Sequence, residues 1–183
     1  GDGTPDSSGS ASYGTPAQAT TSFAMEGIYT LRFSVTDKDG ASSSDTVTIT
    51  VLNRPPECST AGPSPANLWP PNHRMVAVSI VGVTDPEGDP ITITISSIFQ
   101  DEPTNGLGDG DTSPDGQGIG TPTAHLRAER AGVDNARFYH VSFTASDGHD
   151  GSCDGTIRVP VAHDQRRNAE LIDEGPLYDS TVP

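Results

Sequence analysis

The chain has 183 residues, of which 32% are hydrophobic and 5% aromatic, an apolar content that suits β modules rich in Thr and Val. It carries 25 acidic and 10 basic residues, so its formal net charge is −15. Nucleic acids and anionic membrane surfaces attract basic patches, so this charge argues against both as partners. The sequence also contains no apolar run long enough to cross a bilayer.

The first predicted element is a β-hairpin near the N-terminus. Apolar and polar residues alternate over residues 29–35 and again over 45–52, which is the period of half-buried strands. Residues 36–40 form a turn that ends in glycine, as a hairpin requires. Pro55 and Pro56 stop the second strand, because proline cannot donate to a ladder. We therefore place a first domain over residues 1–54.

This hairpin pattern, with Gly-Ile-Tyr-Thr-Leu-Arg-Phe-Ser-Val-Thr-Asp followed by Ser-Asp-Thr-Val-Thr-Ile-Thr-Val, resembles the C-terminal strands of PKD-like immunoglobulin-fold domains. The resemblance covers roughly residues 14–52. Domains of that family are longer, so the resemblance implies that the first strands are missing here. An upstream part of the polypeptide or another chain would have to supply them.

A second series of short strands begins after Pro56. Five segments carry the alternation or turn signals of strands, and none has helical periodicity: residues 76–81, 91–95, 124–128, 137–145 and 155–162. Short strands separated by turns indicate a β-sandwich. We place this second domain over residues 55–165.

The second domain resembles an Ig-like module with a Trp-Pro-Pro-Asn-His motif that occurs in large bacterial surface and secreted proteins. The matching pieces occur in the same order, at residues 68–75, 102–112, 126–130 and 161–165. Together the two resemblances imply an all-β chain of tandem immunoglobulin-like β-sandwiches, the first of which is incomplete. They imply an extracellular location at the cell surface and no catalytic role.

A loop at residues 101–118 carries five carboxylates, five glycines and two prolines. Such a loop is functional or disordered, because it buries too little surface to order itself. Its aspartates repel one another unless a cation lies between them, and Ca²⁺ prefers oxygen ligands of this kind. We predict a calcium site at Asp109, Asp111 and Asp115, joined by Glu102 or Asp101. Glycine stands where an EF-hand needs its twelfth-position glutamate, so the site would have another geometry. A flexible acidic loop is the alternative.

Two further groups are candidates for the same chemistry. The turn that holds Asp85, Glu87 and Asp89 resembles calcium-binding turns of cadherin-like bacterial repeats, although a solvated turn has the same composition. Glu129 follows a predicted strand and is a further candidate ligand. Beside it, Arg127 or Arg130 is predicted to clamp the carboxylates of the acidic loop in bidentate fashion. The alternative is a solvated strand edge whose surface ion pairs contribute little.

The two cysteines, Cys58 and Cys153, lie far apart in the sequence. In a cytosolic protein they would be buried thiols, and in a secreted one a disulfide. The Ser/Thr/Gly/Asp-rich composition favours the secreted case and the disulfide. Trp69, the only tryptophan, is predicted to plug one end of the sandwich; an exposed sugar platform is the alternative.

Residues 166–183 are predicted to be an extended C-terminal tail, too short to fold alone. Its apolar residues are candidates for assembly: Leu171, Ile172, Leu177, Tyr178 and Val182. An incomplete sheet and a free tail together suggest head-to-tail strand donation between neighbouring copies or adjacent modules. The sequence thus predicts a calcium-stabilised structural module rather than an enzyme. The alternative is an accessory module of a secreted hydrolase that binds polysaccharide.

Overall fold

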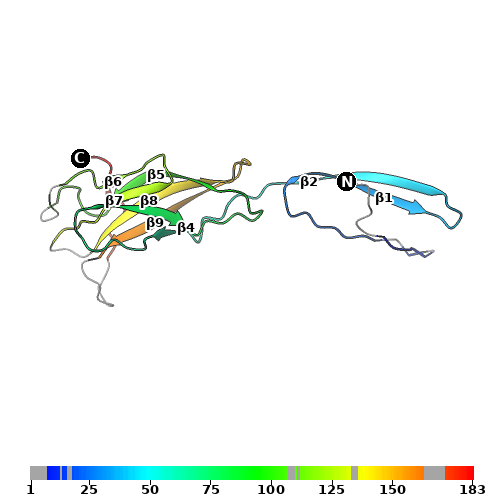
Figure 1. Cartoon of the computed structure of the whole chain (residues 1–183), viewed down its shortest axis with the longest axis horizontal. Helices are drawn as coiled ribbons and strands as arrows, with labels where there is room; N and C mark the ends of the chain where they lie inside the picture. Colours follow the sequence, from blue (N-terminus) through cyan, green and yellow to red (C-terminus); the bar gives the residue numbers. More distant parts are fainter. Residues whose placement is uncertain are drawn as a thin grey trace. The chain divides into compact units, whose positions relative to one another are not determined.

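The computed structural model describes residues 8–12, 14–15, 18–106, 110, 112–132, 136–162 and 172–183. The chain divides into two compact units, Gly1–Asn53 and Arg54–Pro183 (Figure 1). The described residues form strands and no helix, which confirms the all-β prediction. They accordingly include no helix that could span a membrane.

The first unit contains one antiparallel hairpin, formed by β1 (Gly27–Thr36) and β2 (Ser42–Val51). Asp37 closes its turn, because its Oδ1 accepts the backbone N–H groups of Asp39 and Ala41 at 2.9 Å each. The predicted alternation is therefore confirmed as two strands. The predicted half-burial is wrong for much of the apolar face, where Phe33 is 50% exposed and Val47 is 55% exposed. None of the described residues of this unit is buried.

The second unit has two four-stranded antiparallel sheets. The first has the order β10 (Tyr178–Asp179), β5 (Thr92–Gln100), β8 (Arg137–Ser146) and β9 (Ser152–Val161). The second has the order β3 (Gly62–Ser64), β4 (Met75–Val81), β7 (Thr123–Arg127) and β6 (Gly116–Gln117). Apolar side chains of both sheets share one core, as in a β-sandwich. The five predicted strands are all present, whereas β3, β6 and β10 are too short for periodicity to reveal.

The predicted disulfide between the two cysteines is present and spans 95 residues of sequence. It joins Cys58, in the first loop of the second unit, to Cys153 on β9. Both cysteines pack against the core. The disulfide therefore attaches the beginning of this unit to one of its last strands.

The prediction for Trp69 is wrong, because its neighbour takes the buried position. Leu68 is 1% exposed, bridges in parallel to Val161 and donates its backbone N–H to the carbonyl of Pro160 at 2.9 Å. Trp69 is 41% exposed. Neighbouring residues of an extended segment point to opposite sides, so only one of the two can enter the core.

Residues 172–183, called the C-terminal strap below, lie on the second unit instead of forming an unattached tail. The backbone N–H of Leu177 donates to the carbonyl of Gln100, and that of Ser180 donates to Ile98, at 3.0 Å each. The carbonyl of Ser180 accepts from Asp115 at 2.9 Å and Gly116 at 2.8 Å. The strap thus bridges β5 of one sheet and β6 of the other.

The side chains predicted for assembly stay exposed on this strap: Ile172 47%, Leu177 57%, Tyr178 41% and Val182 48%. Leu171 lies outside the described residues. Backbone bonds, the buried Ser180 and a pairing of Asp173 with His140 hold the strap in place. Burial alone would raise the pKa of Asp173, but hydrogen bonds from the Gly175 N–H and from His140 lower it.

We expect Gly116→Ala to destabilise the second unit by about 1–3 kcal/mol, because overpacking forces neighbouring groups to shift. A Cβ at Gly116 would lie 2.8 Å from Cγ2 of Ile98 and 2.9 Å from Cβ of Ser180, beneath the strap. Urea unfolding measures the effect. Gly62→Ala on β3 is the matched control, since a Cβ there meets nothing within 4 Å. Equal stability of the two variants would show that the strap does not press on β6.

Candidate functional site

The most unusual feature of the second unit is a group of charged side chains buried near the ends of its strands. Glu102 follows β5, Asp115 precedes β6, and Glu129 follows β7, while Arg127 ends β7 and Arg137 begins β8. We call these five residues the arginine–carboxylate cluster. Asp115, Glu129 and Arg137 are fully buried, and Glu102 is 8% exposed. Buried charges require partners, so the role of this cluster follows from the groups that its side chains contact.

The guanidinium of Arg137 contacts all three carboxylates of the cluster. Its Nη1 lies 2.7 Å from Oδ2 of Asp115 and 3.5 Å from Oε1 of Glu129, and its Nε lies 3.0 Å from Oε2 of Glu102. The same Glu102 oxygen accepts the backbone N–H of Ala131 at 2.9 Å. Arg137 therefore ties the acidic loop to the loop that follows β7.

Arg127 approaches the cluster from the outer side. Its Nε donates to Oδ1 of Asp115 at 3.3 Å, and its other nitrogens donate to the carbonyls of Pro114 at 2.8 Å and His73 at 3.1 Å. Arg127 thus holds the acidic loop as predicted, through one contact to the Asp115 carboxylate and two to backbone carbonyls rather than through a bidentate pair. Arg130 donates from Nη1 to the carbonyl of Ala131.

Glu129 connects the cluster to the Trp-Pro-Pro-Asn-His segment. Its Oε2 lies 3.1 Å from Nδ1 of His73 and accepts the hydroxyl of Thr112 at 2.7 Å. His73 adopts a left-handed backbone conformation with φ 62°. A Cβ on Gly110 would lie 2.9 Å from its ring, so this glycine lets the acidic loop approach the imidazole.

Three carboxylates face two guanidinium groups in this cluster, so it is short of one positive charge. Burial raises the pKa of Asp115 to about 6, against the favourable effects of the Gln100 amide and Arg137. Gln100 is itself fully buried and donates from Nε2 to Oδ2 of Asp115 at 2.9 Å. A proton on Asp115 would supply the missing charge in mildly acid solution.

We expect the second unit to gain stability on acidification from pH 7 to pH 4. The folded protein binds a proton at Asp115 more tightly than the unfolded chain, because the pKa is raised from 3.8 to about 6. This contribution is complete below pH 3.8 and is lost as pH rises through 6. It amounts to at most about 3 kcal/mol. Urea unfolding across this range should show a gain that Asp115→Asn lacks, and identical profiles would refute the assignment.

The cluster changes the interpretation of the predicted metal ligands. Glu102, Asp115 and Glu129 were predicted to hold calcium, but in the structure each one contacts a guanidinium group. A divalent cation would have to displace these arginines, so we no longer assign the three carboxylates to metal binding. Asp109 and Asp111 lie outside the described residues. Arg137 was not among the predicted site residues, because its only signal in the sequence is a charge at the start of a strongly apolar strand.

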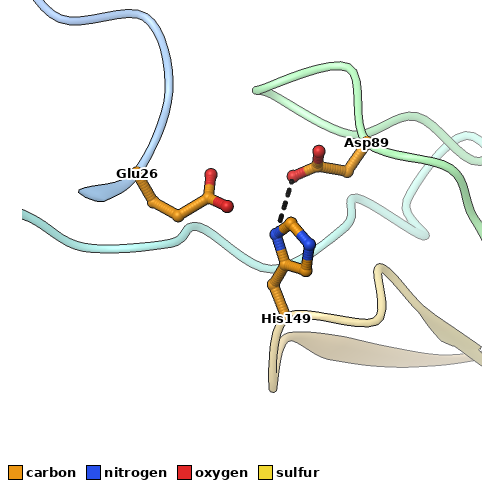
Figure 2. Close-up of side chains that lie close together, drawn as sticks. All are labelled: Glu26, Asp89 and His149. Atoms are coloured by element: carbon orange, nitrogen blue, oxygen red, sulfur yellow. Dashed lines mark ion pairs between the residues drawn. The ribbon is translucent and has the colours of Figure 1, made fainter.

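The second predicted site, the turn at residues 85–89, has different chemistry. Oδ1 of Asp85 accepts the backbone N–H groups of Glu87 at 2.8 Å, Gly88 at 3.0 Å and Asp89 at 3.1 Å. Glu87, whose side chain is 5% exposed, receives Nε of Arg54 at 2.5 Å on Oε1. Figure 2 shows the ring of His149 directed at Asp89, with 3.6 Å between Nδ1 and Oδ2.

Two buried oxygens of this turn accept no hydrogen bond from the described residues: Oδ2 of Asp85 and Oε2 of Glu87. A buried carboxylate oxygen without a donor is costly. A proton, a water molecule or a cation would satisfy it. The turn is therefore the part of the predicted metal set whose chemistry fits a metal ion.

Comparison of the chain with models of protein families, with curated proteins and with solved structures found no match.

Proposed function

We propose that this chain is a structural module of a secreted bacterial surface or filament protein, stabilised by calcium and one disulfide. The arginine–carboxylate cluster supports a structural role, because its carboxylates are buried and paired with arginines rather than presented to a substrate. The Cys58–Cys153 disulfide supports an oxidising, extracellular location. The formal charge of −15 supports a role for divalent cations, which relieve repulsion among carboxylates.

The observation that carries the calcium proposal is the pair of buried oxygens in the turn, on Asp85 and Glu87. Calcium takes oxygen ligands from carboxylates and backbone carbonyls in flexible geometry. Asp85, Glu87 and Asp89 are the residues that would hold it. A bound cation would hold the turn that leads into β5, the strand between β8 and β10.

We expect chelation to lower the melting temperature by several degrees, since calcium at one hundred times its Kd adds about 2.7 kcal/mol. Differential scanning calorimetry of the full chain, with calcium and with excess chelator, measures the effect. Asp85→Asn should remove the difference, because it keeps the capping oxygen but loses the charge. Asp37→Asn makes the same change in the hairpin turn of the first unit, and this variant should still show the difference in melting temperature. An equal melting temperature of the wild-type chain with calcium and with chelator would refute the calcium proposal.

The same proposal includes head-to-tail assembly by strand donation. Its support is the hairpin of the first unit, whose two strands have no further strand beside them among the described residues. Removal of the C-terminal strap would not test this idea cleanly, because β10 already pairs with β5 of its own unit. The acceptor hairpin is the better target for experiments.

Polysaccharide binding is the second candidate, and one observation favours it. Trp69 is 41% exposed beside two prolines, as a stacking platform for a sugar ring would be. A glycan pull-down with the full chain and with Trp69→Ala tests this function. Equal retention of the two proteins would remove the candidate.

A further inference from the structure

The hairpin of the first unit repeats the β8–β9 hairpin of the second unit without a gap. Each residue of the second hairpin has the number of its counterpart plus 110, as Tyr139 has for Tyr29. The registers agree, because Tyr29 lies opposite Ile49 just as Tyr139 lies opposite Val159. All four strands have ten residues.

The turns of the two hairpins are also equivalent. The backbone N–H of Asp37 donates to the carbonyl of Ala41 at 2.9 Å, and that of Asp147 donates to Gly151 at 3.2 Å. In each turn Oδ1 of the aspartate accepts two backbone N–H groups, two and four residues further on. The two hairpins are therefore the same structural element in two environments.

Their burial differs. Seven apolar side chains on the inner face of β8–β9 are each at most 2% exposed: Tyr139, Val141, Phe143, Ala145, Ile157, Val159 and Val161. The counterparts on β1–β2 are apolar as well, but none is buried: Tyr29, Leu31, Phe33, Val35, Val47, Ile49 and Val51. A single two-stranded hairpin is at best marginally stable in water. The first unit therefore has an apolar face that needs a cover.

The second unit shows what covers this element. β5 pairs antiparallel with β8, placing Ile95 opposite Phe143 and Ile98 opposite Val141. The sheet that contains β4 and β7 contributes the other side of the core, including Val78 and Leu126. Along β1, no described strand occupies the position that β5 occupies along β8.

We propose that the free edge of β1 accepts an extended strand of a partner polypeptide, which pairs antiparallel and carries apolar residues at alternate positions, as β5 does for β8. This inference deepens the assembly part of the proposed function, on which it rests.

Among the described residues, β5 of a second copy is not available as this donor, because it already has β8 on one side and β10 on the other. If the hairpins of two copies packed face to face, each would bury a face of roughly 33 Å by 10 Å, the length of ten strand residues and the width of two strands. That area is well below the ~800 Å² per partner of a standard stable interface.

The repeat also identifies the backbone groups that face the donor. Phe138 points its backbone toward β5, because its carbonyl accepts from Asp101 at 3.2 Å and its N–H donates to the Asp101 side chain at 2.8 Å. Alternate residues of a strand point the same way, so Thr30, Arg32 and Ser34 direct their N–H groups to the free edge of β1.

The test uses the full chain and a peptide with the sequence of residues 92–100, flanked by lysines for solubility. Hydrogen exchange followed by NMR should show at least about ten-fold slower exchange at Thr30, Arg32 and Ser34 when the peptide is added. Arg32→Pro removes one edge N–H without touching the β1–β2 ladder, and should weaken the effect. Arg32→Thr keeps that N–H and should preserve it.

Three results would overturn the inference. The first is unchanged exchange at saturating peptide, and the second is equal protection by a scrambled peptide that lacks the alternation. The third is protection of the same amides by the chain alone, increasing with protein concentration, which would identify a second copy as the occupant. The experiment is repeated with excess chelator to separate strand acceptance from calcium binding. If only the calcium proposal is wrong, the peptide still slows exchange at β1, with and without chelator.

Discussion

Arg137→Met should lower the free energy of unfolding of the second unit by about 3–5 kcal/mol, because it leaves buried carboxylates without their guanidinium partner. Arg137 is fully buried and contacts Glu102, Asp115 and Glu129 at 3.0, 2.7 and 3.5 Å. Methionine fills similar space but donates nothing. Urea unfolding at pH 7 measures the loss, which corresponds to a melting temperature lower by on the order of 10 °C.

Arg158→Met on β9 is the matched control for this substitution. Arg158 is 66% exposed and lies 3.3 Å from Asp173, so its loss should cost less than about 1 kcal/mol. Adding Asp115→Asn to Arg137→Met should recover part of the stability, because it removes one uncompensated charge. If Arg137→Met unfolds like the control, the cluster does not hold the acidic loop to the sandwich.

Removal of the disulfide is the second change with a large expected effect. The cross-link closes 95 residues of sequence, and the loop-entropy relation assigns about 4–5 kcal/mol to a loop of that length. We expect the double variant Cys58→Ser, Cys153→Ser to lose most of this amount in urea unfolding under non-reducing conditions. The reason is that the unfolded chain without the cross-link has many more conformations.

Reduction of the wild-type chain should reproduce the loss, which separates the cross-link from any effect of serine on packing. Each single variant should lose about as much as the double variant, because either one already opens the loop. A loss below about 1 kcal/mol in the double variant would mean that the unfolded chain is already restricted near these residues.

The local structure of this chain follows from its sequence to a large extent. The alternation at residues 29–35 and 45–52 predicts β1 and β2, because the side-chain period of a strand depends only on neighbouring residues. The same is true of β5 and β8, and of turns such as that of Asp37, in which a side chain caps its own backbone. Cys58 and Cys153 could be paired because there are only two cysteines.

The two equivalent hairpins, β1–β2 and β8–β9, show that the sequence pattern does not determine which faces are buried. The apolar alternation is the same in β1–β2 and β8–β9, yet Phe143 is 1% exposed and Phe33 is 50% exposed. Burial depends on strands far away in the sequence or in another chain, and periodicity within a strand carries no information about them.

The tertiary structure also decided the partners of the acidic residues. By composition, Asp115 and Glu102 are equally suited to calcium and to arginine, because both partners favour carboxylate oxygens. Only the fold brings Arg137, at the start of β8, to the end of the sandwich where these carboxylates lie. The C-terminal strap is a similar case, since its two-residue ladder has no periodicity to detect. The sequence by itself thus determined the longer strands, their turns and the disulfide, which depend on local chemistry or on a single possible pairing. The tertiary structure decided which charges meet and which apolar faces are covered, because those contacts join residues distant in the chain.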